Sequence, residues 1–142
     1  MPIINYTTKI DVHKTVGEVQ AILAKAGARS VSVDYDSESL PVAVTFVIKI
    51  GEQPVNFRLP SNWEGVLLRI RTDPNITRGL KTEAQARRVS WRIVKDWIEA
   101  QLAIIDAGMA ALPEVFFPYA VTRTGRTVYQ EFSDGRLLAS GE

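Results

Sequence analysis

The sequence predicts an α+β fold with a mostly antiparallel sheet, and three observations lead to it. Segments with period-two hydrophobicity, typical of half-buried strands, occur together with longer segments of helical period. Turn-forming residues at 36–39 and 51–54 separate consecutive strand-like segments. The chain of 142 residues, 46% apolar and 23% charged, has the size and composition of a single globular domain, residues 1–142. The expected order is β-α-β-β-β-α-α-β-β, with a long helix packed on one face of the sheet.

The first part of the chain is expected to form four strands and one helix. Alternating apolar residues predict a strand at about residues 3–12. Thr15 and Glu18 have the spacing of a capping box, which predicts the start of a helix that ends at Gly27. Three further strands are indicated by alternating side chains: Val31, Val33 and Tyr35; Val42, Val44, Phe46, Ile48 and Ile50; and Val55, Phe57 and Leu59.

The second part is expected to be mainly helical. Ser61 and Glu64 form another capping-box pattern, which predicts a short helix to about Thr72. A similar pattern at Thr82 begins the longest helix, which is expected to run to about Ala107. The remaining predictions are a loop at 73–81, one helical turn at 113–117, and a hairpin of short strands at 119–122 and 127–132.

The long helix carries more apolar surface than contact with a sheet requires. Its apolar arc covers roughly 220°, where about 100–150° would suffice for contact with a sheet. The excess predicts contact with the second helix, the C-terminal hairpin or another copy of the chain, so a homo-oligomer is expected. Arg87 faces inward near Glu83, as a buried ion pair or as part of a phosphate pocket with Ser90. Trp91, at the edge of the arc, is either a packing residue or a platform for a base.

Charge is unevenly distributed along the chain. Residues 53–95 contain nine cations and three acids, a net charge of +6, whereas the remainder has eight cations and 13 acids, a net charge of −5. Such asymmetry indicates an anionic partner, and the planar guanidinium of arginine suits phosphate. The candidate ligand-binding residues are Arg58, Arg69, Arg71, Arg78, Lys81, Arg87, Arg88, Trp91, Arg92 and Lys95.

Several classes of function find no support in the sequence. There is no cysteine and only one histidine, His13, which argues against zinc sites, disulfides and multi-histidine metal centres. The phosphate-binding, dinucleotide-binding and hydrolase motifs are absent. The N-terminus lacks the pattern of a signal peptide, and no apolar run is long enough to span a membrane. We therefore expect a cytoplasmic, non-enzymatic protein with neither metal nor cofactor.

Four segments resemble a set of small proteins encoded in bacteriophage and prophage genomes. In chain order they are YTTKIDVHKTVGEVQ, FRLP, ARRVSWRIVKDWIEAQLAIIDAGM and EVFFPY. The resemblance covers nearly the whole chain and implies a viral protein that acts in the host cytoplasm, in replication, recombination or evasion of host defence. A weaker likeness concerns ring-forming single-strand annealing proteins, whose β-β-β-α core presents basic residues to DNA. Residues 42–107 follow that order, with an inserted helix at 62–72.

These observations predict a protein that binds an anionic ligand through an arginine-rich patch, with single-stranded nucleic acid as the first candidate. One alternative is a sponge that sequesters a host nucleotide signal in a pocket formed by Glu83, Arg87 and Ser90. Another is an inhibitor that docks on a host protein through the spare apolar arc and the Phe116/Phe117 turn.

Overall fold

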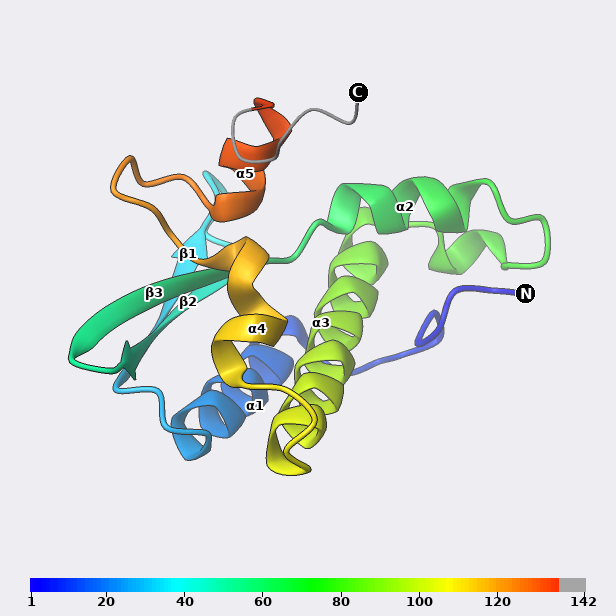
Figure 1. The fold of residues 1–142 in the computed structure, drawn as a ribbon. Coiled ribbons are helices and arrows are strands. Elements are labelled where there is room, and N and C mark those ends of the chain that lie inside the picture. The colour runs from blue at the N-terminus through cyan, green and yellow to red at the C-terminus, as the bar shows by residue number, and fades with distance from the viewer. Residues whose placement is uncertain (136–142) are drawn as a thin grey trace, which may run out of the picture.

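The computed structural model of the chain describes residues 1–135, which fold into five α-helices, three strands and two short 3-10 helices (Figure 1). In chain order these are α1 (Val12–Lys25), β1 (Ser30–Tyr35), β2 (Pro41–Ile50), β3 (Gln53–Pro60), α2 (Trp63–Arg71), η1 (Arg78–Leu80), α3 (Glu83–Asp106), α4 (Leu112–Phe116), η2 (Phe117–Tyr119) and α5 (Val128–Ser133).

The three strands form one antiparallel sheet in the order β1-β2-β3. Val44 in the central strand lies opposite Val33 and Leu59, and Phe46 lies opposite Val31 and Phe57. These alternate positions face the core, whereas Lys49 and the intervening positions of β2 and β3 are more exposed. The α+β class, the antiparallel sheet and the packing of helices on one face are therefore confirmed.

One aromatic cluster joins the sheet to the helices. The ring of Phe46 stacks on Phe57 with centroids 5.3 Å apart. Phe116 of α4 meets Phe46 edge-on at 5.6 Å and Trp97 of α3 at 5.5 Å. Trp97 in turn meets Tyr119 at 5.3 Å. Such contacts bury large areas and also fix ring orientation, so they hold α3, α4 and η2 against the sheet.

Much of the apolar surface of α3 packs against other parts of the same chain. Its Trp91 and Ile98 lie in the main core with residues of α1 and the sheet. Ala86, near its N-terminus, belongs to a second core with Ile70 of α2 and Ile76 of the α2–α3 connection. Figure 1 shows α2 packed beside the beginning of α3 and α1 beside its middle. The wide apolar arc is thus explained by other helices of the same chain, among them the second helix that the sequence analysis named.

The predicted first strand at 3–12 is wrong. Asn5 adopts a positive φ of 64° inside a turn, and the segment crosses α3 as an irregular chain. The side-chain amide of Gln85 donates to the carbonyls of Tyr6 (2.8 Å) and Thr8 (2.9 Å). These bonds satisfy backbone groups that a strand partner would otherwise have to satisfy.

Two of the three predicted helix caps are also wrong. Helix α1 begins at Val12 with Asp11 as its N-cap, one turn before Thr15, because Thr15 is buried against α3 and accepts from Arg92 at 3.4 Å. Ser61 does not cap α2, because its hydroxyl bonds that of Ser90 at 2.7 Å. Thr82 does cap α3, where its hydroxyl accepts from the Gln85 N–H at 3.2 Å.

The predicted C-terminal hairpin reduces to single bridges. Val121 pairs with Thr127, and Ala120 pairs with Phe57 of β3. The residues expected to form the last strand instead form α5. Its start is fixed by a reciprocal capping box, since the Thr127 hydroxyl accepts from the Gln130 N–H and the Gln130 side chain accepts from the Thr127 N–H at 2.7 Å. A strong local cap overrides the weak alternation of this short segment.

Candidate functional site

The candidate cations fall into several groups, and the first connects α3 to α1. Arg92 donates to Glu18 of α1 at 2.9 Å, and Lys95 lies 3.5 Å from the same carboxylate. Lys95 also pairs closely with Glu99. The hydrogen bond from Arg92 holds the pKa of Glu18 below its ordinary value, and the bond to Glu99 raises the pKa of Lys95. These two cations are therefore engaged inside the fold.

Arg87 is buried in an ion-pair cluster. Its exposed fraction is 5%, and its Nη2 donates to Asp36 at 2.9 Å and to Glu83 at 3.1 Å. The guanidinium carbon lies 4.3 Å from the centroid of the Trp63 ring. Burial lowers the pKa of Arg87, but the hydrogen bonds to the two carboxylates outweigh it and the net direction is upward. One cation between two acids leaves no excess positive charge for an anion.

This arrangement matches the ion-pair alternative for Arg87 rather than the phosphate-pocket alternative. The Nε and Nη1 atoms of Arg87 are buried and have no hydrogen-bond partner among the described residues. The third residue expected in the pocket, Ser90, is buried and hydrogen-bonded to Ser61. The cluster joins the β1–β2 turn to α2 and α3.

Trp91 belongs to the core. Its exposed fraction is 1%, and its indole N–H donates to the carbonyl of Pro41 at 3.2 Å. A ring with both faces covered by the protein cannot stack on a base. The expectation that Trp91 forms a stacking platform is therefore corrected, and its packing role is the one observed.

Arg58 and Arg69 lie in different parts of the molecule. Arg58, on β3, donates to the carbonyl of Gly125 at 3.2 Å and lies 3.9 Å from Asp34. Arg69, on α2, donates to Asp73 at 3.3 Å and to the carbonyl of Met1 at 2.8 Å. Figure 1 shows β3 and the end of α2 on opposite sides of the molecule. The ten predicted residues thus do not form one continuous patch.

Four of the predicted cations remain. Three of them are Arg71, Arg78 and Lys81, which we call the loop cations. Arg71 ends α2, Arg78 begins η1, and the Lys81 Nζ donates to the backbone carbonyl of Arg71 at 3.5 Å. Arg71 and Arg78 are exposed, and none of the three forms an ion pair with another described residue. Nearby acids are already engaged, since Asp73 pairs with Arg69 and Glu83 with Arg87.

The fourth remaining cation, Arg88, lies on α3, after the loop cations in the chain. Its Nε donates to the Gln85 side-chain oxygen at 2.9 Å, a neutral partner that leaves the positive charge uncompensated. Arg88 is half-buried and has no ion pair with a described residue. The loop cations and Arg88 are therefore the four predicted residues with free charge.

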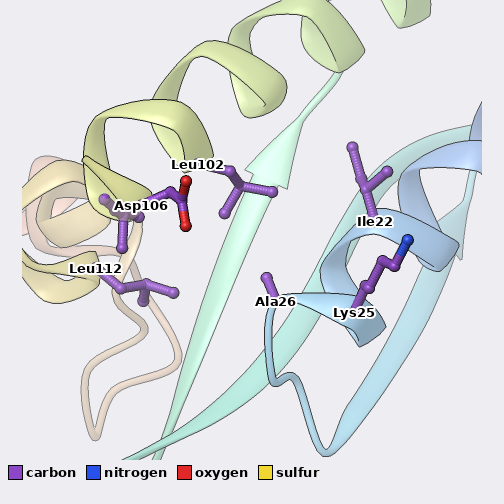
Figure 2. Close-up of a pocket in the computed structure, with 7 residues that line it drawn as sticks. Ile22, Lys25, Ala26, Leu102, Asp106 and Leu112 are labelled. Atoms are coloured by element: carbon purple, nitrogen blue, oxygen red, sulfur yellow. The ribbon is translucent and has the colours of Figure 1, made fainter. Parts of the chain in front are cut away.

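Two hollows of the surface lie away from these four cations. An apolar groove of about 410 Å³ separates the ends of α1 and α3, with Ile22 and Leu102 on its walls and Lys25 and Asp106 contributing charge (Figure 2). A second hollow of about 420 Å³, which we call the tyrosine pocket, lies between β3, η2 and α5. Its lining includes Arg58, Pro60, Asn62, Tyr119, Tyr129 and Gln130.

Arg58 is the one residue of the tyrosine pocket among the ten that the sequence predicts to bind a ligand. The others lie up to about 70 positions away along the chain, and no spacing rule connects them. The one available signal was the capping box of Thr127 and Gln130, which would have placed Tyr129 in the first turn of a helix.

Neither a family model, nor a curated protein, nor a solved structure matches this chain. Among residues 1–135, no helix has the length and apolar character needed to cross a membrane. The same residues contain no group of three or more histidine, aspartate or glutamate side chains placed to hold a metal ion. The geometry described above is therefore the basis for a functional proposal.

Proposed function

We propose that this protein binds single-stranded nucleic acid, without catalysing a reaction, through the loop cations and Arg88. The observation that supports the proposal is that the cations without an ion pair lie in one part of the chain, apart from those paired with carboxylates. Arg87, Arg92 and Lys95 are neutralised by carboxylates, whereas the four unpaired residues lie at the end of α2, on the connection between α2 and α3, or on the first turns of α3.

Unpaired cations favour phosphate binding for an energetic reason. A paired arginine must first give up its carboxylate, while an exposed, unpaired arginine exchanges only water. Three or four phosphate contacts predict a log–log salt slope of about −2 to −3 with a single strand. Contacts of this kind are independent of base sequence.

A single strand suits this surface better than a duplex. Leu68, 67% exposed, lies one helical turn before Arg71 on α2 and adds an apolar side chain beside the cations. Unstacked bases offer such a side chain a partner that a duplex hides. The resemblance to phage-encoded proteins supports action in the host cytoplasm, and this compartment is part of the same proposal.

The test is fluorescence anisotropy with a labelled oligonucleotide of about 20 nucleotides, single-stranded or duplex. The wild-type protein should bind the single strand more tightly and lose affinity about 20- to 60-fold between about 50 and about 200 mM salt. The triple variant Arg71→Gln/Arg78→Gln/Lys81→Gln should lower the magnitude of the salt slope by about 2.

A charge-matched control separates a site from a general effect of net charge. Lys14, Lys25 and Arg29 are exposed side chains of α1 and of the turn after it. Their triple replacement by glutamine removes the same charge elsewhere and should leave binding nearly unchanged. Equal losses in the two triple variants, equal affinity for the duplex, or no binding at low salt would each overturn the proposal.

A further inference from the structure

The tyrosine pocket has walls that the backbone holds in place. The Val121 N–H donates to the Asn56 carbonyl at 2.8 Å, and the Val128 N–H donates to the Ala120 carbonyl at 2.9 Å. The first bond attaches the segment between η2 and α5 to the outer edge of β3, and the second holds the start of α5 against that segment. The ring of Tyr119, on one wall, is fixed by its edge-on contact with Trp97. The pocket is therefore formed before any ligand arrives, as most small-molecule sites are.

The lining combines flat apolar surfaces with hydrogen-bond donors. Tyr119, Tyr129 and Pro60 supply rings, while Arg58 and Asn62 supply N–H groups. Gln130 uses its side-chain oxygen on the Thr127 N–H, which leaves its NH₂ group as a donor. Among residues 1–135, no carboxylate lines the pocket. Rings surrounded by donors complement a flat molecule that carries acceptors or negative charge.

The guanidinium of Arg58 can still bind an anion at the tyrosine pocket. One of its Nη atoms bonds a backbone carbonyl, and its Nε is 3.9 Å from the Asp34 carboxylate, beyond hydrogen-bond distance. The two other acids near this end, Glu131 and Asp134, both lie within ion-pair distance of Arg126. Asp34 is thus the one acid within ion-pair distance of the Arg58 guanidinium among the described residues.

We propose that the tyrosine pocket binds a small planar aromatic molecule that carries a phosphate or a carboxylate. Arg58 holds the anionic group, and Tyr129, 58% exposed and on α5, covers the ring. A volume of about 420 Å³ fits a mononucleotide or a smaller aromatic acid. This site is separate from the loop cations and does not depend on them.

The experiment is isothermal titration of the purified chain with five probes. Adenosine 5′-monophosphate and uridine 5′-monophosphate carry a ring and a phosphate, and 4-hydroxybenzoate carries a ring and a carboxylate. Inorganic phosphate and adenosine provide the anion alone and the ring alone. At least one ring-plus-anion probe should bind about tenfold or more tightly than either partial probe. Binding by the monophosphates only indicates a nucleotide ligand, and binding by 4-hydroxybenzoate only indicates an aromatic acid.

Four variants locate the binding. Arg58→Gln and Tyr129→Ala should each weaken it about tenfold or more. Asp34→Asn removes the acid that competes for Arg58 and should strengthen binding by up to about fivefold. Arg123→Gln removes an exposed charge from the loop before Gly125 and should change nothing.

Three results would overturn the proposal: no probe binds, the partial probes bind as well as the complete ones, or Arg58→Gln binds like the wild type. If Arg58→Gln does not fold, Asp34→Asn still gives a decisive sign, because a pocket without Arg58 contact would not gain affinity. Oligonucleotide binding should be unchanged in Tyr129→Ala, so failure here and failure of the nucleic-acid proposal are distinguishable.

Discussion

Replacing Phe116 by alanine tests whether α4 is an integral part of the core. The Phe116 side chain is 0% exposed and meets the rings of Phe46, Phe57 and Trp97. Removing a buried ring of this kind costs about 3–5 kcal/mol, since transfer free energy is lost and a cavity remains. For a chain of this length, that corresponds to a melting temperature about 10–20 °C lower.

The neighbouring residue provides the control. Phe117 has the same side chain but is 57% exposed, so Phe117→Ala should change the free energy of unfolding by less than about 1 kcal/mol. Urea unfolding followed by circular dichroism measures both variants at one temperature. Because total stability is about 5–15 kcal/mol, Phe116→Leu, with an expected cost of about 1–2 kcal/mol, remains measurable if Phe116→Ala does not fold.

Equal losses in the free energy of unfolding for Phe116→Ala and Phe117→Ala would contradict the claim that α4 is part of the core, because Phe116 is buried and Phe117 is exposed. The two phenylalanines also belong to the turn through which, in the alternative hypothesis, the protein would dock on a host protein. Phe116 is occupied by the core of its own chain, which leaves Phe117 as the exposed ring of the turn.

Three further predictions concern the ion pairs and the cap of α3. Arg87→Met should lower the free energy of unfolding by about 1–3 kcal/mol in urea titrations, because it leaves the partly buried carboxylate of Asp36 without its cation, and Arg87→Ala should cost about 2 kcal/mol more through the cavity it leaves. The pKa values of Glu18 and Asp36 are lowered from 4.5 and 3.8, so their stabilising effect is present above those values and is lost as pH falls through the still lower folded values. Urea midpoints should accordingly fall between about pH 5 and about pH 2, and less steeply in Glu18→Gln. Thr82→Ala should cost about 1 kcal/mol in the same assay, since its hydroxyl accepts from the Gln85 N–H, and an unchanged midpoint would contradict the capping role.

Ion pairs within the fold account for much of the charge asymmetry along the sequence. Acids from the negative part of the chain approach cations of the positive segment: Glu18 meets Arg92, Asp36 meets Arg87 and Asp34 meets Arg58. Much of the positive charge therefore fastens elements together. Among the described residues, Arg71, Arg78, Lys81 and Arg88 have no acid within ion-pair distance, and Arg58 lies 3.9 Å from its one acid, Asp34.

The amino-acid sequence by itself determined the features that depend on neighbours along the chain. The period-two pattern of β2 and β3, the cap at Thr82 and the apolar periodicity of α3 predicted elements that the structure confirms. Predictions from the sequence were wrong where a group far away in the chain determined the local structure. Gln85 donates hydrogen bonds to the carbonyls of Tyr6 and Thr8, and Arg92 donates to the hydroxyl of Thr15.

Three features could be seen in the folded chain alone. They are which arginines lack an ion pair, the burial of Trp91, and the lining of one hollow by both Arg58 and Tyr129. Local hydrogen bonds and side-chain periodicity act over a few residues, and so they can be read from order alone. Ion pairing and burial depend on which surfaces meet after folding, and in this chain the partners are up to about 75 residues apart.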